Sequence, residues 1–263
     1  MTQAVSQAPQ LDSNGLRQAL RIAGGCTIGF TISKLMNWPY GIFFTVYPML
    51  LLGLVPVLNK SIVRQFLASA AISIPMVLIM QGLFSHLPVL MTIIVFLAFC
   101  FLFYQMSSGA AFLFGALGVV GLSIQLHFSS YVTGTSSVYP LILSNGLATV
   151  LSIVIAFVMH GVFPDVTARA VRAVPAKAKE SIRHEVLLCA TVATLSFVAF
   201  QVLDLQDSIS AQASSVLILF SLCWKAAGMA GWQRAIGTLI GCNAALLAQV
   251  LLYNHSDFLL FPV

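Results

Sequence analysis

Long apolar stretches separated by short polar or basic breaks run along almost the whole chain. Residues 65–164, which are 100 residues in all, contain no Asp, Glu, Lys or Arg. A helix needs about 20 apolar residues to span a bilayer, so four spans fit into this segment alone. Along the entire chain the pattern predicts nine spans, near residues 20–37, 40–58, 63–84, 87–105, 108–127, 139–162, 185–203, 208–225 and 234–253.

The apolar stretches show the pattern of helices and not of strands. Residues 90–103 (LMTIIVFLAFCFLF) lack the alternation of apolar and polar positions that a membrane β-barrel strand needs. An isolated apolar segment can satisfy its backbone hydrogen bonds in lipid only as a helix. The predicted fold class is therefore all-α, a polytopic transmembrane bundle of about nine spans surrounded by the lipid bilayer.

The basic residues divide the chain by side of the membrane. If the N-terminus is cytoplasmic, eleven of the 12 Lys and Arg residues fall on cytoplasmic ends and loops, and only Lys34 falls toward the other side. The eleven are Arg17, Arg21, Lys60, Arg64, Arg169, Arg172, Lys177, Lys179, Arg183, Lys225 and Arg234. This bias follows the positive-inside rule and predicts a multi-pass bacterial inner-membrane protein with a cytoplasmic N-terminus.

Composition agrees with a membrane protein and excludes most soluble classes. The 263 residues are 59% hydrophobic and 7% charged, with a mean hydropathy of +0.99. A soluble domain carries roughly a quarter charged residues. The net charge of +5 could indicate nucleic-acid binding, but the charges stand singly at helix ends and form no patch. No nucleic-acid partner is expected.

The sequence after the basic loop resembles the start of the chain, which predicts an internal repeat; the alternative is that any two helices with polar or basic ends resemble each other in this way. Residues 16–30 (LRQALRIAGGCTIGF) align with residues 182–196 (IRHEVLLCATVATLS) at an offset of 166, and each copy has an Arg just before an apolar helix. Parallel repeats of this kind occur in transporters. The predicted organisation is a polar N-terminal tail (1–16), a first six-span repeat (17–162), a basic cytoplasmic loop (163–184) and a partial second repeat of three spans (185–263).

Three short motifs resemble the fusaric acid resistance and aromatic acid exporter superfamily of bacterial inner-membrane proteins, especially its short subgroup of uncharacterised function. They are Arg17 and Arg21 at the start of the first helix, the turn at residues 38–41 (WPYG), and residues 234–241 (RAIGTLIG). The resemblance implies two six-helix halves and export of organic or aromatic acids with a periplasmic membrane-fusion partner. The long exporters carry a large cytoplasmic domain where this chain has only residues 163–184.

Charged and polar side chains close to or within the spans are candidates for a substrate path, because such groups are costly in lipid. The candidates are Lys34, Trp38, Tyr40, Arg64, Asn145, Lys225, Arg234 and Asn243, with Gln201 and Gln249 as further polar groups. Each candidate also has an alternative role. Lys34 and Lys225 can extend their side chains to the membrane interface, the two arginines can fix the orientation of their spans, and the amides can bond to a neighbouring helix. Small residues that permit close helix packing are Gly115, Gly118, Gly121, Gly237, Thr238 and Gly241.

No catalytic, metal or cofactor site is expected. The five cysteines, Cys26, Cys100, Cys189, Cys223 and Cys242, fall inside apolar segments without ligand spacing. The sequence has no Walker, GxGxxG or HExxH motif, and no Ser, His and Asp set converges on one face, which argues against an intramembrane enzyme.

The leading functional hypothesis is an efflux permease subunit for small organic or aromatic acids. The alternative is a non-transporting membrane scaffold or a truncated fragment of such an exporter, because the second repeat has only three of six spans. A homo-oligomer is compatible with the small-residue faces that one copy leaves over. No carboxylate lies deep in a predicted span, so the sequence gives no sign of proton coupling.

Overall fold

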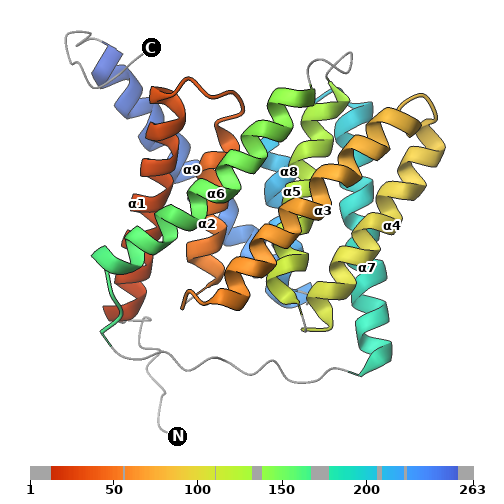
Figure 1. Cartoon of the computed structure of the whole chain (residues 1–263), viewed down its shortest axis with the longest axis horizontal. Helices are drawn as coiled ribbons and strands as arrows, with labels where there is room; N and C mark the ends of the chain where they lie inside the picture. Colours follow the sequence, from red (N-terminus) through yellow and green to blue (C-terminus); the bar gives the residue numbers. More distant parts are fainter. Residues whose placement is uncertain are drawn as a thin grey trace, which may run out of the picture. The chain divides into compact units, whose positions relative to one another are not determined.

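The computed structural model describes residues 13–55, 57–109, 111–131, 138–166, 178–205, 209–221 and 224–253. In these ranges the chain is helical and contains no strand, which confirms the all-α fold (Figure 1). The helices are α1 (Ser13–Leu35), α2 (Ile42–Leu54), α3 (Lys60–Phe84), α4 (Pro88–Ser107), α5 (Phe112–Ser130), α6 (Val138–Val162), α7 (Lys179–Val202), α8 (Ile209–Ile218) with the 3-10 turn η2 (Leu219–Ser221), and α9 (Trp224–Tyr253).

Each of the nine predicted spans falls on one of these helices. Five of the helices in the described ranges, α3 to α7, are long and apolar enough to cross a membrane. The apolar α2 is shorter, with 13 residues. The chain is a multi-pass membrane protein, and the figure of nine crossings stays a prediction.

The first helix of each predicted repeat ends in the same backbone motif. At the end of α1 the Trp38 N–H donates to the Ser33 carbonyl, and Asn37 has a φ of 51°. At the end of α7 the Leu205 N–H donates to the Phe200 carbonyl, and Asp204 has a φ of 50°. Both are Schellman motifs, in which Asn and Asp tolerate the left-handed conformation. The two helices start 166 residues apart and their left-handed residues stand 167 apart, close to the offset of the repeat, which itself stays a prediction.

The helices divide into two compact units that follow other boundaries than the predicted repeat. The first unit takes residues up to 72 and residues 134–175, and the second takes residues 73–133 and those from 176 onward. The first unit therefore holds α1, α2, α6 and the first half of α3. The second unit holds the remaining half of α3 together with α4, α5, α7, α8 and α9.

In the first unit, α1 packs against α2 and α6 through a narrow face of small residues. Arg21, Gly25, Gly29 and Ser33 are buried and stand four apart, so they share one side of the helix. A Cβ at Gly29 would overlap the backbone carbonyl oxygen of Phe44 in α2. The absence of a side chain at this position allows the two backbones to approach.

In the second unit, α4 packs against α5 and α7, and α8 packs against α5. A Cβ at Gly115 would lie 2.5 Å from the Leu102 carbonyl oxygen of α4, and one at Gly118 would lie 2.7 Å from the Leu102 side chain. Residues 113–127 of α5 are all buried. The small residues on α5 therefore bring α4 close, and α5 becomes the core helix of this unit.

Candidate functional site

Helix α5 is a span that is largely enclosed by protein. In its apolar window 89% of the residues are buried, against 28% to 44% in the other four candidate spans of the described ranges. A helix whose sides face lipid must be apolar on those sides, whereas an enclosed helix can carry polar groups that bond to its neighbours. The polar side chains of α5 are therefore the first place to look for function.

The second half of α5 carries a polar residue at every other position, at Ser123, Gln125, His127 and Ser129. All four are buried. Each residue of a helix turns by about 100°, so neighbours two apart face roughly opposite sides while those four apart share a side. The pattern therefore makes two polar faces, one with Ser123 and His127 and one with Gln125 and Ser129.

The first polar face meets α8 through Gln212. The Gln212 amide donates from Nε2 to the Ser123 hydroxyl at 3.2 Å, and its Oε1 lies 2.5 Å from Nδ1 of His127. Because Oε1 can only accept, Nδ1 of His127 carries the hydrogen and donates. All three side chains are almost completely buried. The amide thus fixes the orientation of an ionisable ring inside the unit.

The second polar face meets the C-terminal half of α3. Gln125 donates from Nε2 to the Ser73 hydroxyl at 3.2 Å and to the Gly121 carbonyl at 3.0 Å. Gln81 donates to the Ser129 hydroxyl at 2.7 Å. The Oε1 atom of Gln125 is buried and has no hydrogen-bond partner among the described residues. A buried acceptor without a donor costs about 1 to 3 kcal/mol, so a group that donates a hydrogen bond there would be stabilised.

The surroundings of the α5 polar faces are aromatic at the His127 end, with one exposed carboxylate, Asp204, beyond it. In the described ranges no Asp or Glu is among the buried polar residues. The His127 ring contacts Phe128, Tyr131 and Phe200 with ring centroids 5.2 to 6.3 Å apart. Tyr131, just past the end of α5, donates to the Phe200 carbonyl at 3.0 Å, and partial burial followed by the charge of Asp204 raises the pKa of its phenol.

The first unit has a smaller buried polar pair. Tyr47 of α2 donates its hydroxyl to Oδ1 of Asn145 in α6 at 2.6 Å, and both residues are buried. The Asn145 Nδ2 atom has no partner among the described residues. Aromatic rings surround the tyrosine, with Phe43 at 5.5 Å and Phe66 at 5.7 Å between centroids. Asn145, predicted as a path residue, thus bonds to a tyrosine that contacts aromatic rings, and it keeps a spare donor.

The start of α1 is tied to the segment that follows α6. Arg21 is 2% exposed and pairs with Asp165. Arg17 donates to the Pro164 carbonyl at 2.5 Å, and the Asn14 side chain accepts from the Val166 N–H at 2.8 Å. These contacts give the two arginines at the start of the chain a structural role at this end of the first unit.

Three of the predicted path residues surround the turn between α1 and α2. Lys34 is exposed and its Nζ lies 5.7 Å from the centroid of the Phe30 ring. Trp38 stacks on Phe44 at 5.1 Å between centroids. Tyr40 has a φ of 55°, which is uncommon for a bulky residue and marks a strained turn.

The remaining predicted residues are dispersed. Arg64 is exposed and lines a pocket at the start of α3, Arg234 is half-buried, and Asn243 donates to its own helix at the Leu239 carbonyl. The side chain of Lys225 lies outside the described residues. Gly121 is buried in α5, whereas a Cβ at Gly237 or Gly241 would meet nothing within 4 Å, and Thr238 is exposed. In the described part of the chain no group of His, Cys, Asp and Glu could hold a metal ion.

Sequence analysis missed the polar faces of α5. Sequence analysis singled out none of Ser123, Gln125, His127 and Gln212. The available signal was the alternation of polar residues at 123, 125, 127 and 129 within a stretch otherwise apolar enough to span a membrane.

The sequence profile of one family, described as a protein of unknown function (DUF2955), matches residues 18–159. This match spans more than half of the 263 residues. The chain belongs to the DUF2955 family. The segment shared with DUF2955 proteins includes the four polar residues of α5, Asn145 and the pocket residue Arg64, while Gln212 of α8 lies beyond it. Searches of curated proteins and of solved structures found no match.

Proposed function

We propose that this DUF2955 protein is the membrane subunit of an efflux permease that exports small organic or aromatic acids across the bacterial inner membrane. The observation that carries the proposal is the pair of buried polar faces on the enclosed span α5. Polar side chains at membrane depth are costly, and in transport proteins they mark the route of a solute. Hydrogen-bonding groups on two sides of one enclosed helix are suited to that role.

The chemistry of these faces is compatible with an organic anion. The side chains involved are hydroxyls, amides and one imidazole, and in the described ranges no carboxylate is buried beside them. A buried carboxylate would repel an organic anion in a low-dielectric setting, whereas hydroxyls and amides do not, and the free acceptor Oε1 of Gln125 suits an acid that also carries a hydroxyl group. The resemblance to aromatic acid exporters, noted from Arg17 and Arg21, the WPYG turn and residues 234–241, suggests organic or aromatic acids as the substrate class and adds the periplasmic membrane-fusion partner.

The test compares accumulation of a panel of aromatic acids in bacteria that lack or express the chain. Cells that express the wild-type protein should retain less of at least one acid. Gln125→Leu removes the Gln125 amide from one polar face at nearly constant volume and should slow export roughly 5- to 150-fold, the equivalent of about 1 to 3 kcal/mol. Asn243→Leu also replaces an amide by leucine, but at an exposed position whose amide bonds to its own helix, so it should export normally.

Expression level and thermal unfolding temperature of both variants must match the wild type before rates are compared. Equal retention of every acid in cells with and without the chain would overturn the transport proposal and favour a non-transporting scaffold. Loss of export in Asn243→Leu alone would place the solute path away from α5.

A further inference from the structure

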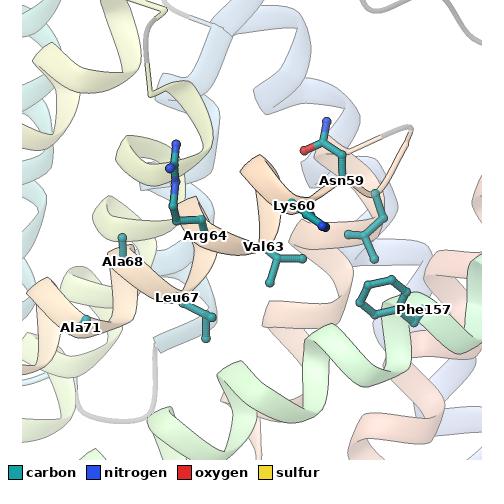
Figure 2. Close-up of a pocket in the computed structure, with 9 residues that line it drawn as sticks. Asn59, Lys60, Val63, Arg64, Leu67, Ala68, Ala71 and Phe157 are labelled. Carbon is teal, nitrogen blue, oxygen red and sulfur yellow. The ribbon is translucent and has the colours of Figure 1, made fainter.

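A pocket of about 710 Å³ opens at the start of α3 within the first unit (Figure 2). Its walls are formed by α3, by the residues just before it and by one residue of α6. The lining residues are Leu58, Asn59, Lys60, Val63, Arg64, Leu67, Ala68, Ala71 and Phe157. Pockets of this size hold small molecules or parts of larger ones.

One end of the pocket is cationic and has no acidic partner. Lys60 and Arg64 stand one helical turn apart and are exposed, and in the described ranges neither forms an ion pair. The first turn of α3 contains no acidic residue. The positive end of the helix dipole adds to these two charges, so this end of the pocket attracts an anionic group.

The rest of the pocket is apolar and elongated. From Lys60 to Ala71 the helix rises about 16 Å, at about 1.5 Å per residue. Along this length Val63, Leu67 and Phe157 present apolar groups, and Leu67 and Phe157 are 44% and 58% exposed. Ala68 and Ala71 leave room beside the helix where longer side chains would fill it. Figure 2 shows Phe157 on the side of Lys60 and Val63 at the start of α3, Leu67, Ala68 and Ala71 farther along the helix, and the Arg64 side chain extending away from Phe157.

We propose that this pocket binds an anionic phospholipid. The phosphate contacts Lys60 and Arg64, and one acyl chain starts against Val63 and Phe157 and then runs along α3 past Leu67 to the two alanines. A charged head joined to a long apolar tail fits a pocket with charge at one end and about 16 Å of apolar wall. A small aromatic acid would use the charges and leave the apolar length unfilled. This site is independent of the polar faces of α5.

The test is native mass spectrometry of the full chain in detergent, titrated with phosphatidylglycerol or with phosphatidylcholine of the same acyl chains. The wild type should bind the anionic lipid more tightly. Lys60→Gln with Arg64→Gln should lower that preference about thirtyfold, which corresponds to about 1 kcal/mol per basic residue. Lys179→Gln with Arg183→Gln is the matched control, because these residues repeat the same spacing at the start of α7 and are also exposed.

A second variant separates the pocket from its charge. Ala71→Phe fills the apolar length at an exposed position and keeps both cations, so it should weaken binding of phosphatidylglycerol while leaving the unfolding temperature unchanged. Equal loss in the Lys179 and Arg183 control would show a general charge effect and overturn the site. Tight binding of benzoate that displaces the lipid and is insensitive to Ala71→Phe would assign the pocket to a small acid instead.

Discussion

Glycines that look alike in the sequence differ in what surrounds them. Gly29 in α1 faces the backbone of α2, so that a Cβ would overlap the Phe44 carbonyl oxygen, whereas a Cβ at Gly237 in α9 would meet nothing within 4 Å. The absence of a side chain at Gly29 therefore allows α1 and α2 to pack closely. Gly237 contacts no other element in the described part of the chain in this way.

We expect Gly29→Ala to destabilise the protein by about 1 to 3 kcal/mol, because α1 and α2 must move apart or strain. Gly237→Ala should be neutral or stabilising by up to about 1 kcal/mol, because alanine is the better helix former and the space is open. Thermal unfolding in detergent measures both. A lower unfolding temperature for Gly237→Ala than for Gly29→Ala would contradict this account of the packing.

Residue types predicted two polar residues of the first unit and none of the candidate site on α5. The sequence indicates Asn145 and Arg64 because amides and charges are rare in spans. In the structure Asn145 bonds to the buried Tyr47, and Arg64 lines a pocket. Gln212 could not have been chosen in the same way, because a glutamine near the start of a span usually faces water. Its importance comes from lying beside Ser123 and His127, 89 and 85 residues away, which no local pattern reveals.

Arg21 in α1 forms an ion pair with Asp165 after α6, and it is the most deeply buried charged residue in the described part of the first unit. Arg21 is 2% exposed and the Asp165 side chain 16%. Removing the carboxylate leaves a buried cation without its counter-ion, whereas removing the guanidinium leaves a carboxylate that water can partly reach. The two substitutions therefore differ in cost.

We expect Asp165→Asn to destabilise the protein by about 3 to 5 kcal/mol and Arg21→Met by less. Asp204→Asn is the control, because Asp204 is exposed at the end of α7 and asparagine tolerates its left-handed backbone. Unfolding temperatures of the three variants give the order. If Arg21→Met proved the more damaging change, the argument from burial would fail.

At the scale of helices the sequence predicts the positions of the helices along the chain well. It does not predict which helices are buried by protein and which face lipid. Apolar length predicted a helix for each of nine segments, because a run of some 20 apolar residues has few other solutions in lipid. The enclosure of α5 was not predicted, since hydropathy is the same for a side that faces lipid and a side that faces protein. Only the polar residues on α5 distinguish it, and they are few.

For the whole molecule, the distribution of basic residues makes a prediction about sides of the membrane. Residues 167–177 carry Arg169, Arg172 and Lys177, and they should be cytoplasmic, whereas residues 132–137 should be periplasmic. Alkaline phosphatase fused after residue 134 should be active, because its disulfides form only outside the cytoplasm, and the same fusion after residue 172 should be inactive. An active fusion at residue 172 would reverse the orientation and the direction of the proposed export.

The organisation of the whole chain is less accessible from sequence than its helices are. A repeat of offset 166 divides the chain at its basic loop, yet the compact units divide α3 between residues 72 and 73 and recruit α6 to the first unit. Internal sequence similarity indicates which segments of the chain correspond to each other. The compact units show which helices pack together. The repeat and the compact units therefore need not coincide. The candidate site on α5 lies within one compact unit, the second.

The contact between His127 and Gln212 has a consequence for how the protein is made. The two residues are 85 positions apart, so at 5 to 20 residues per second a ribosome needs roughly 4 to 17 s to deliver the glutamine after the histidine. The partners of Gln125 and Ser129 in α3 have already been synthesised by then. The polar face with Gln125 and Ser129 can therefore bond to α3 as soon as α5 enters the membrane. The face with His127 has no Gln212 to bond to until α8 has been made, so during these seconds the imidazole needs another hydrogen-bond partner, such as water or a membrane insertase.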